Sequence, residues 1–435
     1  MTGLIMAAQL ILGLSILILL HELGHFLSAR MFGIKVDKFY LFFDAWGFKL
    51  FHFKTKNTEY GIGWLPFGGY CKIAGMIDES MDKEQMKQPP QPWEFRSKPA
   101  WQRLIVMVAG VFMNLVLGSV IFAFVTFHWE KEYLPNNNVT SGIYAYESAR
   151  DIGFKTGDKI VSVNNKKIKR FKDALSINVL LGATITVERS GNTIDIKVPE
   201  DFYKTYKSNN RDFFIDATNF HPVIDSVISG STAEKSGLKK GDKFLMIDTI
   251  NTSVYGKFRE EIWKCKGKTI ALRTVRNNDT LTKNVQVDST GVIGILCKVP
   301  YDFKEYSFFS ALTYGTSDAL SNLWANIRGM GRIFSGKENA RESLQGPIGI
   351  AHIYGGKWDW YRFWSITGLL SMILAFMNIL PIPALDGGHV IFTAIEMITR
   401  RKFSDSFMEK VQMVGMFIIL GIMVLVIFND ILKLF

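Results

Sequence analysis

The sequence predicts an α-helical polytopic membrane protein with four transmembrane helices, a membrane-dipping β-hairpin and two small β-rich domains. Three observations lead to this fold class. Long apolar stretches lie near both ends of the 435-residue chain. Residues 138–298, between them, are polar. A short glycine-rich pattern occurs twice within that polar part, which indicates an internal repeat.

Composition supports a membrane protein and argues against nucleic-acid binding. The mean hydropathy is +0.12 although 21% of the residues are charged, because apolar and polar segments are mixed in one chain. The net charge of +11 is spread over the sequence without a long basic run. Cys71, Cys265 and Cys297 do not form a zinc-ribbon spacing. Cys265 and Cys297 could pair in an oxidising compartment, but we expect two ordinary thiols.

The first predicted span, residues 4–29, contains the motif His21-Glu22-Leu23-Gly24-His25. It lacks a basic start and a small-residue cleavage site, so we do not expect a signal peptide. On a helix, HExxH places two imidazoles on one face, where both can bind one zinc ion, and the Glu can take a proton from the attacking water. The alternative is a buried helix with two hydrogen-bonded histidines. Burying two His and one Glu side chain in a membrane span costs free energy, and a segment without a function would rarely carry them. The pattern therefore favours the metal site.

The loop at 30–103 is rich in Lys and Arg, whereas no basic residue precedes the first span. The positive-inside rule therefore places the loop in the cytoplasm and the N-terminus outside. Arg30 is the next charged residue after Glu22 and lies about 12 Å further along a helix, so the metal site is expected near the cytoplasmic side. Within the loop, Glu59 to Ala74 (EYGIGWLPFGGYCKIA) has a glycine-rich turn between two β-forming runs. This pattern predicts an apolar hairpin that dips toward the membrane.

The second predicted span, residues 104–127, contains one strongly polar side chain, Asn114. Gly110 and Gly118 share its helix face, because each lies one turn away. Small residues on one face are typical of a helix-packing seam, whereas an intramembrane Asn can also face a substrate. The sequence leaves both interpretations open.

The polar middle contains the repeat, which reads GFKTGDKI from Gly153 and GLKKGDKF from Gly237. Strand-like alternation follows each copy, and later β-forming runs lie at Thr184–Glu188, Thr193–Val198, Thr269–Thr274 and Leu281–Val287. We therefore expect two β-rich modules, at 138–200 and 220–299.

The remaining segments return the chain to the membrane. Residues 305–335 have an apolar stripe interrupted by polar residues, which predicts an amphipathic helix on the membrane surface within a region at 301–357. Residues 360–380 and 411–432 are the third and fourth predicted spans, and the basic run at 400–402 between them marks the cytoplasm. The membrane domain would thus consist of residues 1–134 and 358–435.

A catalytic zinc usually has three protein ligands, and two candidates for the third follow the third span. These are Asp386 and His389, and topology puts both at the membrane depth of His21 and His25. Pro381 and Pro383 break the helix before Asp386, so local unwinding can aim its carboxylate inward. Alternatively, Asp386 caps a helix, and His389 is a supporting or core histidine.

Together, HELGH, PFGGY, the paired GxxxGD repeats and NILPIPALDGG resemble the site-2 protease family, specifically its bacterial regulator-of-sigma-E protease type. The resemblance covers nearly the whole chain and implies that the two β-rich modules are PDZ domains. It also implies that His21, His25 and Asp386 are zinc ligands and that Glu22 is the general base.

The resemblance implies two groups of substrate-binding residues. Asn378 would handle the substrate backbone, and the turn with Gly68, Gly69 and Tyr70 would belong to a hairpin that pairs with the substrate as an added strand. One departure concerns the second span: a GPxxN motif common in the family reads GVFMN here, with Val111 in place of Pro. The family role therefore does not carry over directly to Asn114, which we keep as a candidate substrate-binding residue.

The expected activity is that of a zinc-dependent intramembrane endopeptidase in a bacterial inner membrane, with the modules and both termini in the periplasm. Its expected substrates are single-span segments of the anti-sigma-factor type, already trimmed outside, and signal-peptide remnants. The lipid bilayer is the other expected partner, and nucleic acid is not. The alternatives are a catalytically inactive PDZ scaffold, disfavoured by the intact motif, and a membrane metalloprotease for soluble peptides, disfavoured by the depth of the site.

Overall fold

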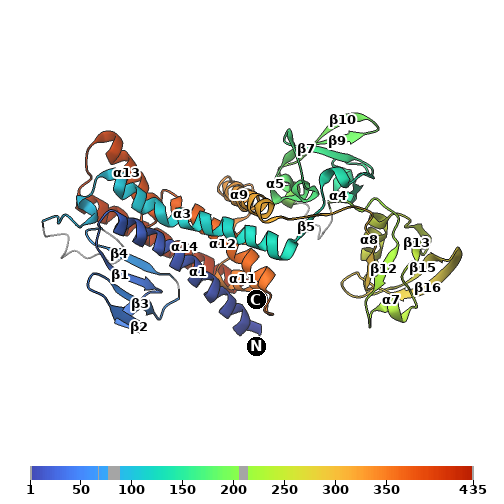
Figure 1. Cartoon of the computed structure of the whole chain (residues 1–435), viewed down its shortest axis with the longest axis horizontal. Coiled ribbons are helices and arrows are strands. Elements are labelled where there is room, and N and C mark those ends of the chain that lie inside the picture. The colour runs from blue at the N-terminus through green and yellow to red at the C-terminus, as the bar shows by residue number, and fades with distance from the viewer. Residues whose placement is uncertain (1, 67, 77–88, 205–213, 434–435) are drawn as a thin grey trace. The chain divides into compact units, whose positions relative to one another are not determined.

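The structure is a computed structural model that describes residues 2–66, 68–76, 89–204 and 214–433. It divides into two compact units (Figure 1). The membrane unit consists of Met1–Lys131 and Tyr306–Phe435, and the middle unit is Glu132–Glu305.

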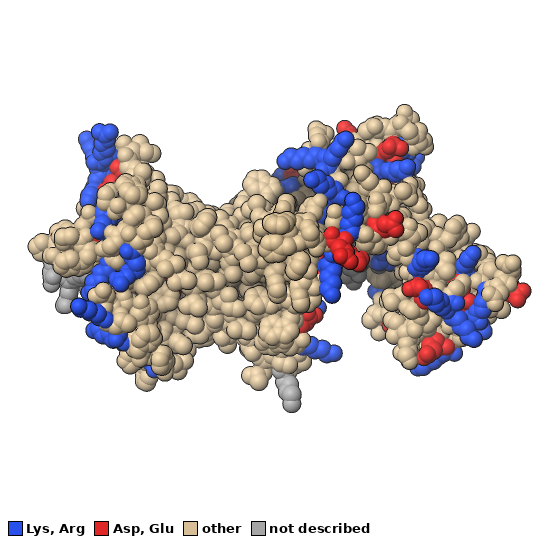
Figure 2. All heavy atoms as spheres, in the orientation of Figure 1, with Lys and Arg blue, Asp and Glu red and all other residues tan. Residues whose placement is uncertain are grey.

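Four helices of the membrane unit are long and apolar enough to cross a membrane, which confirms the expected number of spans for the described residues. They are α1 (Thr2–Met31), α3 (Ala100–Val125), α12 (Trp360–Ile379) and α14 (Asp405–Leu432). A π-helical turn at Thr126–Glu130 extends α3. Figure 2 shows a broad face of this unit almost without charged side chains, with Lys and Arg gathered at one end. The chain is thus a membrane protein.

Helix α3 lies at the centre of the membrane unit and packs against α1 and α12 (Figure 1). Small residues allow these close approaches: a Cβ atom on Gly118 would lie 2.5 Å from the sulfur of Met372 on α12. A Cβ on Gly24 of α1 would similarly approach the backbone of Ala109. The seam of small residues considered for the second span is therefore present at Gly118.

Helix α9 (Phe308–Phe334) corresponds to the predicted amphipathic segment and is not among the candidate spans. It packs on α3 through small residues; a Cβ on Gly315 would collide with the backbone of Ala123. Its large apolar side chains, including Phe309 and Trp324, are exposed. Further α-helices among the described residues of this unit are α10 (Ala340–Ser343), α11 (Pro347–Tyr354) and α13 (Asp386–Thr399).

The loop after α1 forms a sheet in the order β2-β3-β1-β4. The strands are β1 (Val36–Leu41), β2 (Lys49–Lys54), β3 (Glu59–Gly63) and β4 (Tyr70–Ile73). The predicted hairpin of β3 with β4 is wrong, because both strands pair with β1, β3 in parallel and β4 antiparallel. The true hairpin partner of β3 is β2.

Glu59 links β3 to both of its neighbours in the sheet. Its carboxylate accepts hydrogen bonds of 2.5 Å from Lys49 Nζ on β2 and from the Tyr40 hydroxyl on β1. These bonds lower the pKa of Glu59 to about 2 and hold β3 between its two neighbours. A bridge between Phe43 and Leu65 then directs the chain past the end of β1, so β4 becomes an edge strand.

The middle unit contains two modules with the same strand order. In the first, the sheet is β10-β9-β7-β8, and in the second it is β16-β15-β13-β14. The strands are β7 (Lys159–Val163), β8 (Lys166–Lys167), β9 (Ala183–Arg189), β10 (Asn192–Val198), β13 (Lys243–Ile247), β14 (Ile250–Asn251), β15 (Thr269–Arg276) and β16 (Asp279–Gln286). The repeat in the sequence is therefore a repeat in the structure.

Each module also has a two-stranded sheet and short helices. The strand pairs are β6 (Tyr144–Ala145) with β11 (Ile215–Asp216), and β12 (Ile224–Val227) with β17 (Ile295–Cys297). Among the described residues, the helices include α4 (Glu147–Asp151), α5 (Ile177–Leu180), α7 (Thr232–Lys235) and α8 (Tyr255–Lys264). A further pair, β5 (Glu132–Tyr133) with β18 (Lys304–Glu305), joins the two ends of the unit.

The GxxxGD repeat makes the same ion pair in both modules. Buried Asp158 accepts hydrogen bonds from Arg189 Nε and Nη2, at 2.7 and 2.8 Å. Asp242 accepts the equivalent bonds from Arg276, at 2.6 and 2.8 Å. Each carboxylate also accepts the backbone N–H three residues before it. The motif thus closes the loop before the first strand of each sheet.

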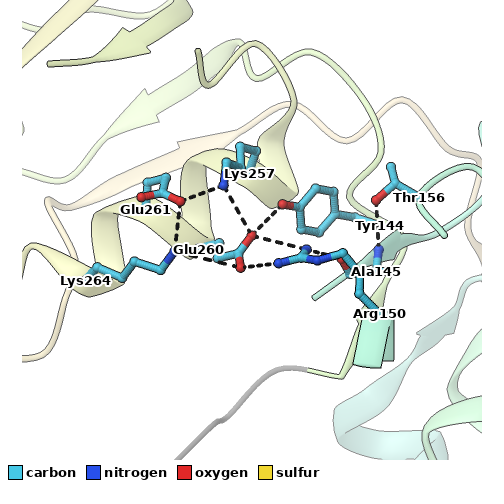
Figure 3. Close-up of polar contacts among 8 residues, drawn as sticks. All are labelled: Tyr144, Ala145, Arg150, Thr156, Lys257, Glu260, Glu261 and Lys264. Carbon is cyan, nitrogen blue, oxygen red and sulfur yellow. Dashed lines mark hydrogen bonds and ion pairs between the residues drawn. The ribbon is translucent and has the colours of Figure 1, made fainter. Parts of the chain in front are cut away.

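The two modules meet at a buried charge network on α8 (Figure 3). Glu260 accepts hydrogen bonds from the Tyr144 hydroxyl at 2.6 Å and from Arg150 Nη2 at 2.8 Å. Burial raises the pKa of Glu260, but the bonds from Arg150 and Tyr144 outweigh it and leave the pKa below its usual value.

All three cysteines are free, so Cys265 and Cys297 do not form a disulfide.

Candidate active site

Three side chains with metal-binding atoms meet where α1 faces the start of α13. His21 and His25 lie one turn apart on α1, and Asp386 is the first residue of α13. Asp386 Oδ2 is 3.1 Å from His21 Nε2 and 3.3 Å from His25 Nε2. The two Nε2 atoms are 3.3 Å apart.

This arrangement fits a bound cation. The three ligand atoms lie within 4.8 Å of one another, and both histidines are buried. Asp386 Oδ2 is buried and has no partner with hydrogen-bond geometry, although both imidazoles are within ion-pair distance. A carboxylate oxygen and two imidazole nitrogens that converge on one point form a donor set that suits zinc.

The segment between α12 and α13 aims Asp386 at the histidines. Ala384 has a positive φ of 79°, which turns the chain before Leu385 and α13. Leu385 is the N-cap residue, so the structure does not support the helix-capping alternative for Asp386. A Cβ atom on Gly387 would collide with the carbonyl oxygen of Leu380, so glycine allows this turn to close tightly.

The outer nitrogen of each imidazole has a polar neighbour on α3. His25 Nδ1 is 2.8 Å from the carbonyl oxygen of Val106, which leaves Nε2 directed at the ligand cluster. His21 Nδ1 is 3.3 Å from the side-chain amide of Asn114, which is 1% exposed. A half-turn of this amide would offer Oδ1 to the N–H of His21. The position of Asn114 favours the orientation of His21 over contact with a substrate.

Glu22 adjoins the cluster and contacts the edge strand of the sheet. Its half-buried carboxylate lies close enough to the backbone N–H of Cys71 on β4 for a weak electrostatic contact. Because β4 is an edge strand, this contact places the open edge of the sheet beside Glu22. Sequence analysis missed the contact, since it involves a backbone group.

The turn residues predicted to bind substrate have structural contacts with α1 and with the segment after β1. A Cβ on Gly69 would lie 2.6 Å from the side chain of Ile18 on α1, and one on Gly68 would lie 2.5 Å from the ring of Phe43. The Tyr70 hydroxyl donates to Asp44 Oδ1 at 2.8 Å. Phe67, which precedes them in the motif, lies outside the described residues.

Asn378 and Gly110 complete the surroundings of the histidines. Asn378 Nδ2, near the end of α12, is 3.2 Å from His21 Nε2. A Cβ atom on Gly110 of α3 would collide with both imidazoles, so this position requires glycine. The recurrence of small residues at Gly110, Asn114 and Gly118 was the signal in the sequence for this face. His389 lines a separate cavity, one turn further along α13.

Comparison with known proteins agrees with this site. The sequence profile of peptidase family M50 matches residues 9–422. A "Putative zinc metalloprotease" of Clostridium perfringens is 28% identical over 427 residues, which is 97% of each chain. A protein of the same name from Borreliella burgdorferi is 28% identical over 432 residues, covering 97% of this chain and 96% of the relative. The "Regulator of sigma E protease" of Haemophilus influenzae is 25% identical over 452 residues, which is 98% of each chain. The chain therefore belongs to peptidase family M50, the site-2 protease family, and is a zinc metalloprotease.

Proposed function

We propose that the protein is an intramembrane endopeptidase that cleaves single-span transmembrane segments. The observation that carries this proposal is the position of the ligand cluster: His21 and His25 lie within one candidate membrane span, and Asp386 follows another. A site at this depth favours membrane-inserted substrates over soluble peptides. The convergence of the three side chains also counts against an inactive scaffold.

In this proposal His21, His25 and Asp386 hold the zinc ion, and Glu22 is the general base. Zinc supplies a Lewis acid that polarises the scissile carbonyl group. The Glu22 carboxylate takes a proton from the attacking water and gives it to the nitrogen of the leaving amine. The N–H of Cys71 lies beside that carboxylate, where it would help to orient it. Val106 and Asn114 fix the orientation of the two imidazoles.

The substrate would be bound by strand addition to β4. A helical substrate satisfies its own backbone hydrogen bonds and resists attack until it unwinds locally. An open strand edge offers the unwound backbone new partners where water is absent. Asn378 lies beside His21, where its amide can donate to the substrate backbone. Gly69 would act indirectly through its close approach to α1, and Gly68 and Tyr70 through contacts with the segment after β1.

The proposal includes a location and a substrate class. We place the protein in the bacterial inner membrane, with the basic loop after α1 in the cytoplasm and the middle unit in the periplasm. Exposed aromatic side chains on and before β2, including Trp46 and Phe51, support contact between the sheet and the bilayer. The name of the Haemophilus influenzae relative supports substrates of the anti-sigma-factor type. The two modules would be PDZ domains that restrict access to the site.

The test compares one substrate sequence inserted in a membrane with the same sequence free in solution. A single-span substrate reconstituted into vesicles and a soluble peptide of the same sequence are incubated with the purified protein. We expect cleavage of the inserted substrate, loss of cleavage after zinc removal and recovery after zinc is restored. Cleavage of the soluble peptide alone would contradict the proposal.

A further inference from the structure

We propose that a cavity beside the active site binds an acidic side chain of the substrate, a few residues from the scissile bond. The inference rests on the proposed function, since it assigns a subsite to the same catalytic centre. We call it the α13 cavity, and its volume is about 240 Å³. Its lining includes Met76, Arg103, His389, Glu396, Lys402 and Phe403.

Three elements of the active site lead to the α13 cavity. His389 lines it and follows Asp386 by one turn of α13, about 5 Å along the helix. Arg103 lines it from α3, about 10 Å before Gly110, which faces both imidazoles. Gly75 lines it just beyond β4, about 13 Å from Cys71 in an extended chain. The cavity therefore lies on the side of the ligand cluster toward Arg103 and His389.

A substrate strand paired with β4 would pass this cavity. Cys71 contacts Glu22, so the scissile bond lies near that position of the strand. At about 3.3 Å per residue, the substrate reaches the cavity roughly two to four residues from the bond. Successive side chains of a strand point to opposite faces, so only every second substrate residue faces the cavity. The preference for an acidic side chain should therefore occur at one substrate position, or at two positions that are two residues apart.

Most charges around the cavity are paired, but Lys402 is not. Arg103 Nη2 is 2.6 Å from Glu396 Oε1, and both side chains are largely buried. Lys402 is exposed, and its Nζ is 3.4 Å from the carbonyl oxygen of Arg96. Among the described residues, no carboxylate lies within 4.0 Å of this ammonium group. Among the described residues that line the cavity, Lys402 is therefore a positive charge without a carboxylate partner.

Apolar side chains line the cavity next to this charge. The ring of Phe403 lies 5.4 Å from that of Phe392 on α13 and 5.4 Å from that of Phe407 on α14. These contacts hold the segment that carries Lys402 against the cavity. Because Lys402 is exposed, solvent screens its charge, so an acidic side chain is attracted and a basic one repelled only modestly. The cytoplasmic ends of membrane segments are usually rich in Lys and Arg. The cavity would therefore disfavour many membrane segments as substrates.

The experiment is a charge scan of a reconstituted single-span substrate. Asp, Asn or Lys is placed at each position up to about six residues on either side of the scissile bond. Wild type, Lys402→Ala, Lys402→Glu and the control Lys410→Glu are compared. Lys410 is exposed on α14 and does not line the cavity. Each set is assayed in neutral vesicles and in vesicles with anionic phosphatidylglycerol.

For wild type and Lys410→Glu we expect Asp to be cleaved roughly fivefold faster than Lys at the cavity position. Lys402→Ala should flatten this preference, and Lys402→Glu should invert it. An unchanged preference in Lys402→Glu would overturn the assignment, as would no positional preference in wild type. A uniform loss of cleavage in Lys402→Glu, seen only with phosphatidylglycerol, would also overturn it in favour of a lipid headgroup. Failure of wild type to cleave any inserted substrate would instead overturn the proposed function, and the cavity assignment with it.

Discussion

The backbone N–H of Cys71 lies beside the carboxylate of Glu22. This contact joins two parts of the site that the sequence presents separately, the HExxH helix and the glycine-rich motif of the following loop. It places the open edge of the sheet beside the residue that we assign as the base. The proposed binding of an extended substrate and the proposed proton transfer therefore occur at the same position.

Replacement Glu22→Gln should abolish cleavage and leave zinc bound. The three ligand side chains remain, but the amide cannot accept the proton of the attacking water, so we expect a loss of roughly a hundredfold or more. Metal analysis and a cleavage assay on the same purified sample check both parts. His25→Ala is the control, since it should lose zinc as well as activity. Turnover of Glu22→Gln at the wild-type rate would exclude Glu22 as the base.

Replacement Cys71→Pro should lower activity by roughly tenfold or more without loss of zinc. Proline removes the N–H that contacts Glu22 and disturbs the edge strand. Cys71→Ser is the matched control, because it changes the side chain and keeps the N–H. Similar cleavage rates for both variants on several inserted substrates would argue against a role for this edge.

Local patterns in the sequence predict the membrane helices and the histidine pair, whereas they leave Asp386 and His389 open as the third ligand, and the family resemblance singles out Asp386. Hydropathy identifies a span, and the i, i+4 spacing places His21 and His25 on one face. The hairpin prediction failed because strand pairing depends on distant partners: Glu59 is held by Tyr40 and Lys49, and β1 separates β3 from β4. The contacts of Cys71 and Val106 use backbone groups, which carry no signature in the sequence.

Asp430 should be important for the stability of the membrane unit. Its buried carboxylate, near the end of α14, accepts hydrogen bonds of 2.9, 2.9 and 3.0 Å from the backbone N–H groups of Gly346, Ile348 and Gly349 at the start of α11. Asp430→Ala leaves these donors without an acceptor and should cost roughly 2–4 kcal/mol. Thermal unfolding in detergent should show a lower midpoint for Asp430→Ala, an intermediate one for Asp430→Asn and no change for the surface control Lys410→Met. Unfolding of Asp430→Ala at the wild-type temperature would contradict this role.

The middle unit should restrict access to the active site without contributing to the chemistry. His21, Glu22, His25 and Asp386 all belong to the membrane unit. The two chain ends that flank the middle unit are adjacent, since the N–H of Tyr306 donates to the carbonyl oxygen of Lys131 at 2.7 Å. A short flexible linker can therefore replace Glu132–Glu305. We expect the shortened protein to bind zinc and to cleave a substrate with a short ectodomain.

The same deletion distinguishes a filter from a docking site. If the modules exclude bulky ectodomains, the shortened protein should also cleave substrates with intact ectodomains that the full-length protein rejects. If they instead bind substrate termini, deletion should raise KM and admit no new substrate. Kinetics for both substrate types with both proteins separate these outcomes. If the shortened protein retains zinc but no longer cleaves the short-ectodomain substrate, the filter model is contradicted. A filter excludes bulky substrates and is not needed for the cleavage of small ones.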